Sequence, residues 1–338
     1  MPKRISVVVP CYNGRRYLDD CLRSVAEVDD GTYEVVVVDD GSTEPIADVV
    51  DRWAPLARYL RQSNQGPGAA RNHGIAATSG EYVRFLDCDD TLLPTGALRE
   101  QVVLLDEHPE VGLVYGQAER IDGHGRAFGR RRPTHAATGY RHTGEEELPG
   151  LLLLGNYMTT STIVARRSAL EAAGPFRTDL LGPEDWDCWL RVAQVAGIAY
   201  VAQPVAGYRS HGTSITANYS PDRWLAMHHD ILDRTFADPR FPAQHQHLRA
   251  GARARLDGVA AQLAYSHERM DLARGYALRA LASGLRERRW RRSGDAAWLT
   301  VKSLLPVRLR RPLRQVGHSY RLAASSVAAG RRAAVGRA

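Results

Sequence analysis

Apolar residues follow two alternating patterns along the first 116 residues of the chain. Short runs rich in apolar residues predict strands over 5–10, 33–39, 57–62, 81–87 and 111–116, and apolar residues at helical spacing predict helices over 17–28, 45–53, 68–77 and 94–108. Strands that are apolar on both faces are typical of a sheet covered by helices on both sides. The pattern therefore predicts an α/β fold with a mostly parallel central sheet flanked by helices.

The second part of the chain is less regular. Residues 117–147 are rich in Gly, Arg, His and Thr and predict an irregular segment or a pair of short strands. Residues 160–176 predict a strand and a helix that ends at Gly174, residues 182–197 predict a helix with an acidic first turn, and residues 198–214 predict a strand and a loop. After about residue 221 the chain predicts helices, including a pair over 250–285.

Polar, turn-forming residues follow three of the predicted strands. Their sequences are PCYNG at 10–14, DDGS at 39–42 and DCDD at 87–90. Because open α/β sheets bind ligands at the carboxyl ends of their strands, we expect these three ends to converge on one cleft.

The acidic cluster at 87–90 is the first candidate for chemistry. Two carboxylates one residue apart, Asp87 and Asp89, can hold Mg²⁺ or Mn²⁺ while water and substrate phosphates fill the remaining positions. The cation would stabilise a diphosphate as a leaving group. A solvated acidic turn is the alternative for a D-x-D motif taken alone.

Three further side chains are candidates for the same cleft. Asp40 can accept a hydrogen bond from a base or a ribose, or can act in a turn and helix cap. Tyr12 can stack on a nucleobase or pack within the protein. Arg71, in the glycine-rich segment 64–74, can approach a phosphate or a base, or remain solvated.

The order and spacing of these motifs resemble the inverting, nucleotide-sugar-dependent glycosyltransferases of family 2, which include cellulose, chitin and hyaluronan synthases and many bacterial enzymes. The similarity runs through ISVVVPCYNG, VVVVDDGSTE, NQGPGAARNHGI, GEYVRFLDCDD, GPEDWDCWLR and YRSHGTSI, over residues 3–216. It implies the GT-A nucleotide-diphospho-sugar transferase fold. It also implies donor contacts at Pro10, Tyr12, Asp40, Arg71, Asp87, Cys88 and Asp89. In this reading Asp89 ligates the cation, Asp87 and Cys88 face the ribose, Tyr12 and Asp40 contact the base, and Pro10 lines the base pocket.

The sequence PEDWD at 183–187 corresponds to the acceptor-side E-D motif of the family. The resemblance implies that Asp185 is the general base, which takes the proton of the acceptor hydroxyl. It further implies that Glu184 holds an acceptor hydroxyl and that Trp186 forms the acceptor floor. An ordinary acidic first turn of a helix is the alternative.

The sequence YRSH at 208–211 resembles a family loop that brings a histidine to the metal or a basic residue to the diphosphate. The resemblance therefore implies a metal contact at His211 and leaves Arg209 as a basic residue near it. A surface loop is the alternative. The QxxRW motif and flanking membrane helices of processive synthases are missing, which favours the addition of a single sugar.

Charge divides the chain into an acidic part and a basic part. Residues 231–338 hold 22 Lys and Arg against 7 Asp and Glu, although the formal net charge of the whole chain is only +7. We expect a catalytic domain over 1–220, with a donor half at 1–116 and an acceptor half at 117–220, a helical appendix over 221–285, and a basic tail over 286–338.

The basic tail is expected to contact an anionic membrane surface. Leu305, Leu309 and Leu313 lie near helical spacing among arginines, as in interfacial helices, although Pro306 and Pro312 weaken this pattern. A solvated tail is the alternative, and sparse aromatic residues argue against nucleic acid. No window approaches the roughly 20 apolar residues that cross a bilayer, and the first apolar run is too short for a signal peptide. We therefore expect a cytoplasmic protein, peripheral at the inner face of the plasma membrane.

These observations predict a metal-dependent, inverting transfer of one sugar from a nucleoside diphosphate sugar to a glycan or polyprenyl-linked acceptor. UDP is favoured over dTDP and GDP as the nucleotide, and a homodimer is left open. Two alternatives are a nucleotidyltransferase acting on sugar phosphates and a non-catalytic membrane-associated adaptor with the same fold. The first would need a triphosphate cradle, and no P-loop is present in the sequence. The four cysteines lack CxxC spacing and are expected to be reduced thiols.

Overall fold

The computed structural model describes residues 4–131, 141, 142, 144–211 and 220–286, so the predicted basic tail lies outside the described residues except for its first position. The chain divides into two compact units. Unit 1 comprises Met1–Tyr219 and Ala226–Arg249, and unit 2 comprises Ser220–Leu225 and Ala250–Ala338.

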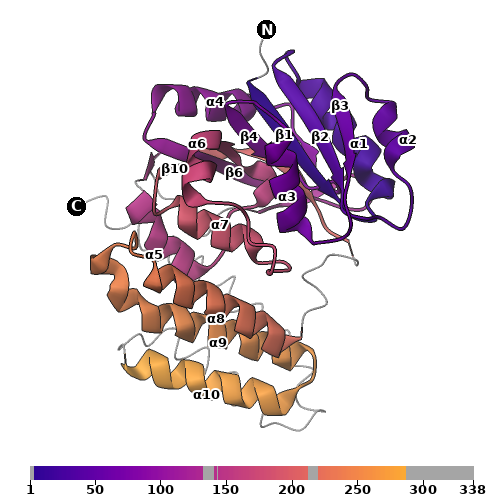
Figure 1. Ribbon diagram of the computed structural model, residues 1–338. Helices are drawn as coiled ribbons and strands as arrows, with labels where there is room; N and C mark the ends of the chain where they lie inside the picture. The colour runs from indigo at the N-terminus through magenta and orange to yellow at the C-terminus, as the bar shows by residue number, and fades with distance from the viewer. Residues whose placement is uncertain (1–3, 132–140, 143, 212–219, 287–338) are drawn as a thin grey trace, which may run out of the picture. The chain divides into compact units, whose positions relative to one another are not determined.

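A mixed sheet of ten strands crosses unit 1 within the described residues (Figure 1). The strands follow the order β3-β2-β1-β4-β9-β6-β10-β5, with β7 beside β6 and β8 beside β10. Their bounds are β1 Ile5–Cys11, β2 Tyr33–Asp39, β3 Ala57–Arg61, β4 Tyr82–Phe85, β5 Thr91–Leu92, β6 Val111–Ile121, β7 Ala127–Arg131, β8 Arg141–His142, β9 Val164–Arg166 and β10 Gly197–Arg209.

The sheet is parallel in its first half and mixed in its second. Strands β3, β2, β1 and β4 run parallel to one another, as the sequence predicts, and β6 runs parallel to β10. Strand β9 lies between β4 and β6 and is antiparallel to both. One three-residue strand therefore joins the two parallel parts into a continuous sheet.

Helices cover both faces of β1 and β2, which explains why most residues of these two strands are apolar and buried. On one face Val7 and Val9 pack in the core with Leu18 and Leu22 of α1 (Arg15–Val28) and with residues of α2 (Ala47–Asp51). On the other face, α3 (Pro67–Ala76) lies against β1 and β2 (Figure 1). A Cβ at Gly74 would lie 2.4 Å from a methyl carbon of Val8, so the glycine permits this close packing.

Helices also cover the second half of the sheet. They are α4 Ala97–Glu107, α5 Gly144–Leu154, α6 Arg167–Ala173 and α7 Glu184–Val192, and a short 3-10 helix spans Thr160–Thr162. The prediction for 117–147 was incomplete, because β6 continues to Ile121 and pairs with β7, and α5 begins at Gly144. Helix α5 has no clear helical periodicity in its sequence and contains Pro149.

Three helices follow the sheet in the chain, as the sequence predicts. They are α8 Pro221–Ala237, α9 Arg249–Ser266 and α10 Met270–Arg286. Within unit 2, Tyr276 of α10 donates its hydroxyl to Asp222 of α8, and Arg279 donates to Asp257 of α9 at 3.2 Å. Across the described part of the chain, every helix is too short or too polar to span a bilayer.

Candidate active site

The three polar strand ends meet at one edge of the sheet. Cys11 at the end of β1 is aligned with Asp39 at the end of β2, and the amide of Asp40 donates to the carbonyl of Cys11 at 2.8 Å. After β4, the amide of Leu86 continues the ladder by donating to the carbonyl of Val8 at 3.2 Å. The three strand ends therefore lie side by side at one edge of the sheet, and the cleft expected there stays a prediction.

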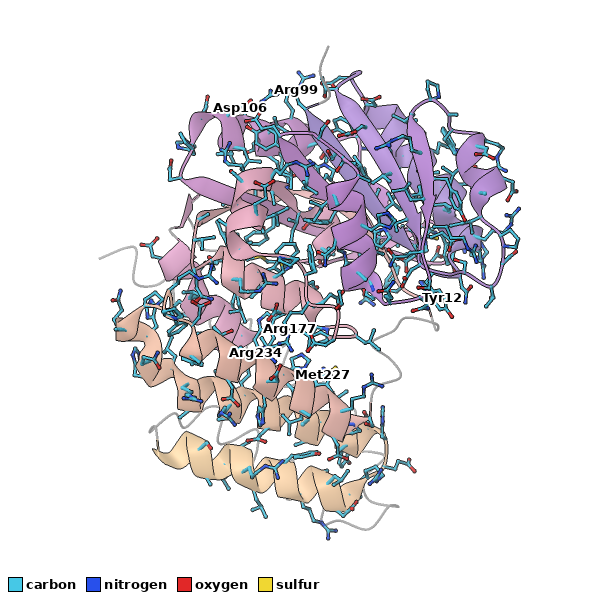
Figure 2. The ribbon with its side chains drawn as sticks, viewed as in Figure 1. Tyr12, Arg99, Asp106, Arg177, Met227 and Arg234 are labelled. Carbon is cyan, nitrogen blue, oxygen red and sulfur yellow. The ribbon has the colours of Figure 1, made fainter. Side chains whose placement is uncertain are left out.

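Tyr12 is the most exposed of the candidate side chains. It is 48% exposed and projects from the end of unit 1 opposite to the end that carries Arg99 and Asp106 of α4 (Figure 2). Pro10, two residues earlier, is buried within β1. The ring of Tyr12 is thus available to stack on a base, and its contact with a nucleotide stays a prediction.

Asp40 is buried and mainly holds a loop in place. One carboxylate oxygen accepts from the side chain of Gln62 and the amide of Gln65, both at 2.9 Å, and the other accepts from the amide of Gly66 at 2.8 Å. A carboxylate offers about four acceptor positions, so about one remains for a ligand. The geometry supports the loop-anchoring role and leaves the base contact as a prediction.

The acidic turn after β4 packs directly on the start of α1. A Cβ at Gly14 would lie 2.3 Å from Sγ of Cys88 and 2.9 Å from Sγ of Cys11. Cys88 is buried and its thiol is free, so its side chain faces the protein and any ribose contact would come from its backbone. Asp89, the next residue, lies with its Oδ2 2.7 Å from Nε2 of His211.

The carboxylates of the turn are close enough to influence one another. Burial, and then the charge of Asp87, raise the pKa of Asp89, while the hydrogen bond with His211 opposes this shift. Asp90 is fully enclosed, and burial followed by the charges of Asp89 and Asp87 raises its pKa well above the usual range. A cation at this turn would relieve the repulsion between these groups.

Arg209 holds the turn from the end of β10. Its Nε donates to the carbonyl of Asp89 at 2.6 Å, its backbone amide donates to Asp90 at 2.8 Å, and its guanidinium lies over the ring of Tyr17 at 4.6 Å. The side chain is buried, so it is not directed to a diphosphate. Arg209 and His211 instead both pack on the ring of Tyr17, whose centroid lies 5.2 Å from that of His211.

The donor set of Asp89 and His211 fits a divalent cation. Mg²⁺ is usually held by one or two carboxylates plus substrate phosphates, and imidazole is a suitable ligand for transition metals. Within residues 4–131, 141, 142, 144–211 and 220–286, no group of three or more His, Cys, Asp and Glu side chains has the arrangement of a metal cage. Two protein ligands therefore suit a cation that completes its coordination with phosphate oxygens.

Asp185 lies in the first turn of α7 and keeps part of its surface exposed. Its Oδ2 accepts from Nδ2 of Asn156 at 2.8 Å and from the hydroxyl of Thr160 at 3.1 Å, and its Oδ1 accepts from the amide of Trp186 at 2.6 Å. Burial first, and the charge of Glu184 second, raise the pKa of Asp185 to about 7. A carboxylate with a pKa near the working pH is suited to general base catalysis.

Glu184 and Trp186, predicted to contact the acceptor, are both enclosed. Glu184 accepts from Arg71 at 2.6 Å and from the amide of Gly182 at 2.8 Å. Trp186 is 1% exposed and donates its indole N–H to the carbonyl of Leu151 at 3.1 Å. The geometry thus gives both residues a structural role, and their acceptor contacts stay predictions.

Arg71 links the two carboxylate clusters. It is buried, and its guanidinium donates to Asp87 at 2.8 Å and to Glu184 at 2.6 Å, with the ring of Phe176 5.7 Å away. The predicted proximity of Arg71 to the donor turn is confirmed. Its charge is matched by protein carboxylates, so phosphate contact stays a prediction.

Sequence reasoning missed a polar segment that touches both clusters. Besides Asn156 and Thr160 at Asp185, Ser161 donates to Asp90 at 2.6 Å and accepts from the amide of Asp87 at 3.1 Å. The available signal was four consecutive hydroxyl residues, 159–162, followed by the apolar start of a strand. All four are buried.

The fold and the strand-end motifs have counterparts among known proteins. The model of "Glycosyl transferase family 2" matches residues 6–174. The chain belongs to glycosyl transferase family 2. The predicted family is thereby confirmed.

Relatives and solved structures agree with this assignment. The chain is 31% identical over 224 residues to an uncharacterized glycosyltransferase of Nostoc sp., covering 62% of this chain and 66% of the relative. It is 29% identical over 215 residues to the PGL/p-HBAD biosynthesis glycosyltransferase of Mycobacterium bovis, covering 61% of this chain and 77% of the relative.

The solved structures confirm the GT-A fold. S. aureus TarS 1–349 has a TM-score of 0.64 and 18% identity, covering 92% of this chain and 91% of that one. The mannosyltransferase PcManGT from Pyrobaculum calidifontis, solved with GDP-Man and Mn²⁺, has a TM-score of 0.55 and 20% identity, covering 90% of this chain and 88% of that one.

Proposed function

We propose that this family 2 glycosyltransferase transfers one sugar, with inversion, from a nucleoside diphosphate sugar to a hydroxyl of a glycan or lipid-linked acceptor. The observation that carries the proposal is the link between two carboxylate centres. Ser161 contacts the acidic turn that ends at Asp90, and the adjacent Thr160 contacts Asp185. A candidate donor site and a candidate base are thus held by neighbouring residues.

In this proposal Asp185 takes the proton of the acceptor hydroxyl as that oxygen attacks the anomeric carbon. Inversion requires attack from the face opposite the leaving diphosphate, and a single positioned carboxylate is sufficient for it. Tyr12 would stack on the base. A divalent cation held by Asp89 and His211 would neutralise charge on the departing diphosphate.

UDP is the proposed nucleotide. Support comes from the fold neighbour S. aureus TarS 1–349, which was solved in complex with UDP-GlcNAc and has a TM-score of 0.63 and 18% identity. PcManGT, in turn, was solved with GDP-Man, so GDP-sugars belong in any test.

A panel of UDP-, dTDP- and GDP-sugars with Mn²⁺, compared with Asp185→Asn, tests the proposal. We expect at least one donor to release nucleoside diphosphate, and we expect the variant to turn over on the order of 10²- to 10⁴-fold more slowly with donor affinity retained. Release of pyrophosphate from a nucleoside triphosphate plus a sugar phosphate would instead identify a nucleotidyltransferase. No turnover with any donor would favour the adaptor alternative.

A further inference from the structure

The segment between α5 and β9 supplies two hydrogen bonds to a single oxygen of the proposed base. Asn156 and Thr160, four residues apart, both donate to Oδ2 of Asp185, at 2.8 and 3.1 Å. The remaining oxygen, Oδ1, accepts one hydrogen bond from the amide of Trp186. The two oxygens of the carboxylate are therefore not equivalent.

Each carboxylate oxygen has two acceptor positions, so Oδ2 is fully occupied and Oδ1 keeps one position free. We propose that Asn156 and Thr160 are positioning residues for sugar transfer, which occupy Oδ2 of Asp185 and leave Oδ1 as the atom that receives the acceptor's proton. This inference rests on the proposed function, because it requires Asp185 to be the base.

The amide of Asn156 supports this assignment. Its Oδ1 is buried and has no hydrogen-bond partner in the described part of the chain. A buried polar atom without a partner destabilises the fold, and a flipped amide would place this oxygen against the carboxylate of Asp185, which only accepts. An amide at this position is thus costly to the fold, and the N–H that it directs at Asp185 explains its presence.

Charged and titratable groups surround Asp185, and the neutral donors Asn156 and Thr160 act on its pKa in addition to them. Glu184 and Cys188 lie on the same helix, and Arg71 on α3 faces the carboxylate and lowers its pKa. From α8, His228 packs 5.4 Å from the ring of Trp186 and faces that ring. Hydrogen bonds from neutral donors favour the charged carboxylate, so both donors oppose the upward effect of burial on the pKa.

The pH dependence of kcat tests the proposal, with the most active sugar nucleotide of the panel and Mn²⁺ as the probe. Loss of a donor in Thr160→Val or Asn156→Ala should move the acidic limb of the profile to higher pH. A displacement of about one unit lowers kcat about tenfold below the limb, while kcat at high pH stays within a few-fold of the wild-type value. Thr160→Ser keeps the hydroxyl and should return the limb to its wild-type position.

The controls separate this inference from the proposed function. UDP affinity measured by calorimetry with Mn²⁺ identifies the variants that remain folded. If Thr160→Val and Asn156→Ala do not fold, the position of the acidic limb in the conservative variant Thr160→Ser still tests the proposal. The positioning role would be overturned if the acidic limb of the kcat profile did not move in Thr160→Val and Asn156→Ala. It would also be overturned if Thr160→Ser displaced that limb as far as Thr160→Val does. An acidic limb that persists in Asp185→Asn would instead overturn Asp185 as the base.

Discussion

Replacing Arg71 by methionine removes the cation that two carboxylates share. The side chains of Arg71 and Glu184 are only 5% and 4% exposed and lie 2.6 Å apart. Removing one partner of a buried ion pair leaves an uncompensated charge and destabilises a protein by about 3–5 kcal/mol. Asp87 is 35% exposed, so water compensates for the loss on that side. We therefore expect the free energy of unfolding of Arg71→Met to fall by about 3–5 kcal/mol, mainly because of Glu184.

Urea unfolding followed by tryptophan fluorescence measures this loss, because Trp186 and Trp189 are buried in the helix that Glu184 begins. The double variant Arg71→Met/Glu184→Gln removes the stranded charge and should regain more than half of the lost stability. Arg52→Met is the matched control, since Arg52 is 55% exposed in its pair with Asp19 and such pairs contribute about 0–1 kcal/mol. A loss in Arg71→Met no larger than in Arg52→Met would refute the reasoning, as would a double variant no more stable than the single one.

The same double variant also tests the predicted nucleotide contact of Arg71. If that side chain binds the donor, the double variant should regain stability without regaining affinity for UDP in calorimetry with Mn²⁺. An unchanged affinity would assign Arg71 to the framework of the site alone.

Three further predictions concern the metal, the base and the tail. Asp89→Ala should lose Mn²⁺-dependent UDP binding in calorimetry, and unchanged affinity would remove Asp89 from the metal site. Asp185 has its pKa raised from 3.8 to about 7, so the folded protein keeps a proton that the unfolded chain releases, and wild-type stability falls as pH rises through this interval. The Tm of Asp185→Asn relative to wild type should therefore rise from pH 4 to pH 7 and then level off, and a constant difference would contradict the shift. Truncation after Gly284 should abolish sedimentation with anionic liposomes at low salt while leaving UDP binding intact, whereas a full-length chain that ignores such liposomes would exclude a membrane role for the tail.

The parallel half of the fold could be predicted from the sequence because apolar runs and the turn residues that bound them indicate the same strands there. The run of residues 33–39 is apolar between turn residues and forms β2 with the predicted bounds. Helix α5 was missed because three glutamates, two glycines and Pro149 obscure any helical period, and Leu148, Leu151 and Leu152 are buried by tertiary contacts. The antiparallel direction of β9 also depends on long-range pairing, which periodicity does not report.

The candidate site was predicted in part for the same reason. Strand ends place Asp89 and Asp40 at the predicted edge, whereas the orientation of each side chain depends on neighbours distant in sequence. Asn156 lies 29 residues before Asp185, and Arg71 lies 113 residues before Glu184. Motifs therefore identified which residues gather, and the structure was needed to show which atoms are free and which are already bonded.

The position of β9 has a consequence for fragments of this chain. A piece that ends before β9 would contain the strand-end motifs of residues 10–90 but not His211, and β4 and β6 would each lose β9 as a neighbour. Exposed edges of apolar strands recruit other chains and promote aggregation. The strand-end motifs of residues 10–90 therefore do not form a module that could be excised, recombined or expressed alone. To transfer donor specificity between relatives, one would have to exchange the loops at the strand ends and keep the sheet intact.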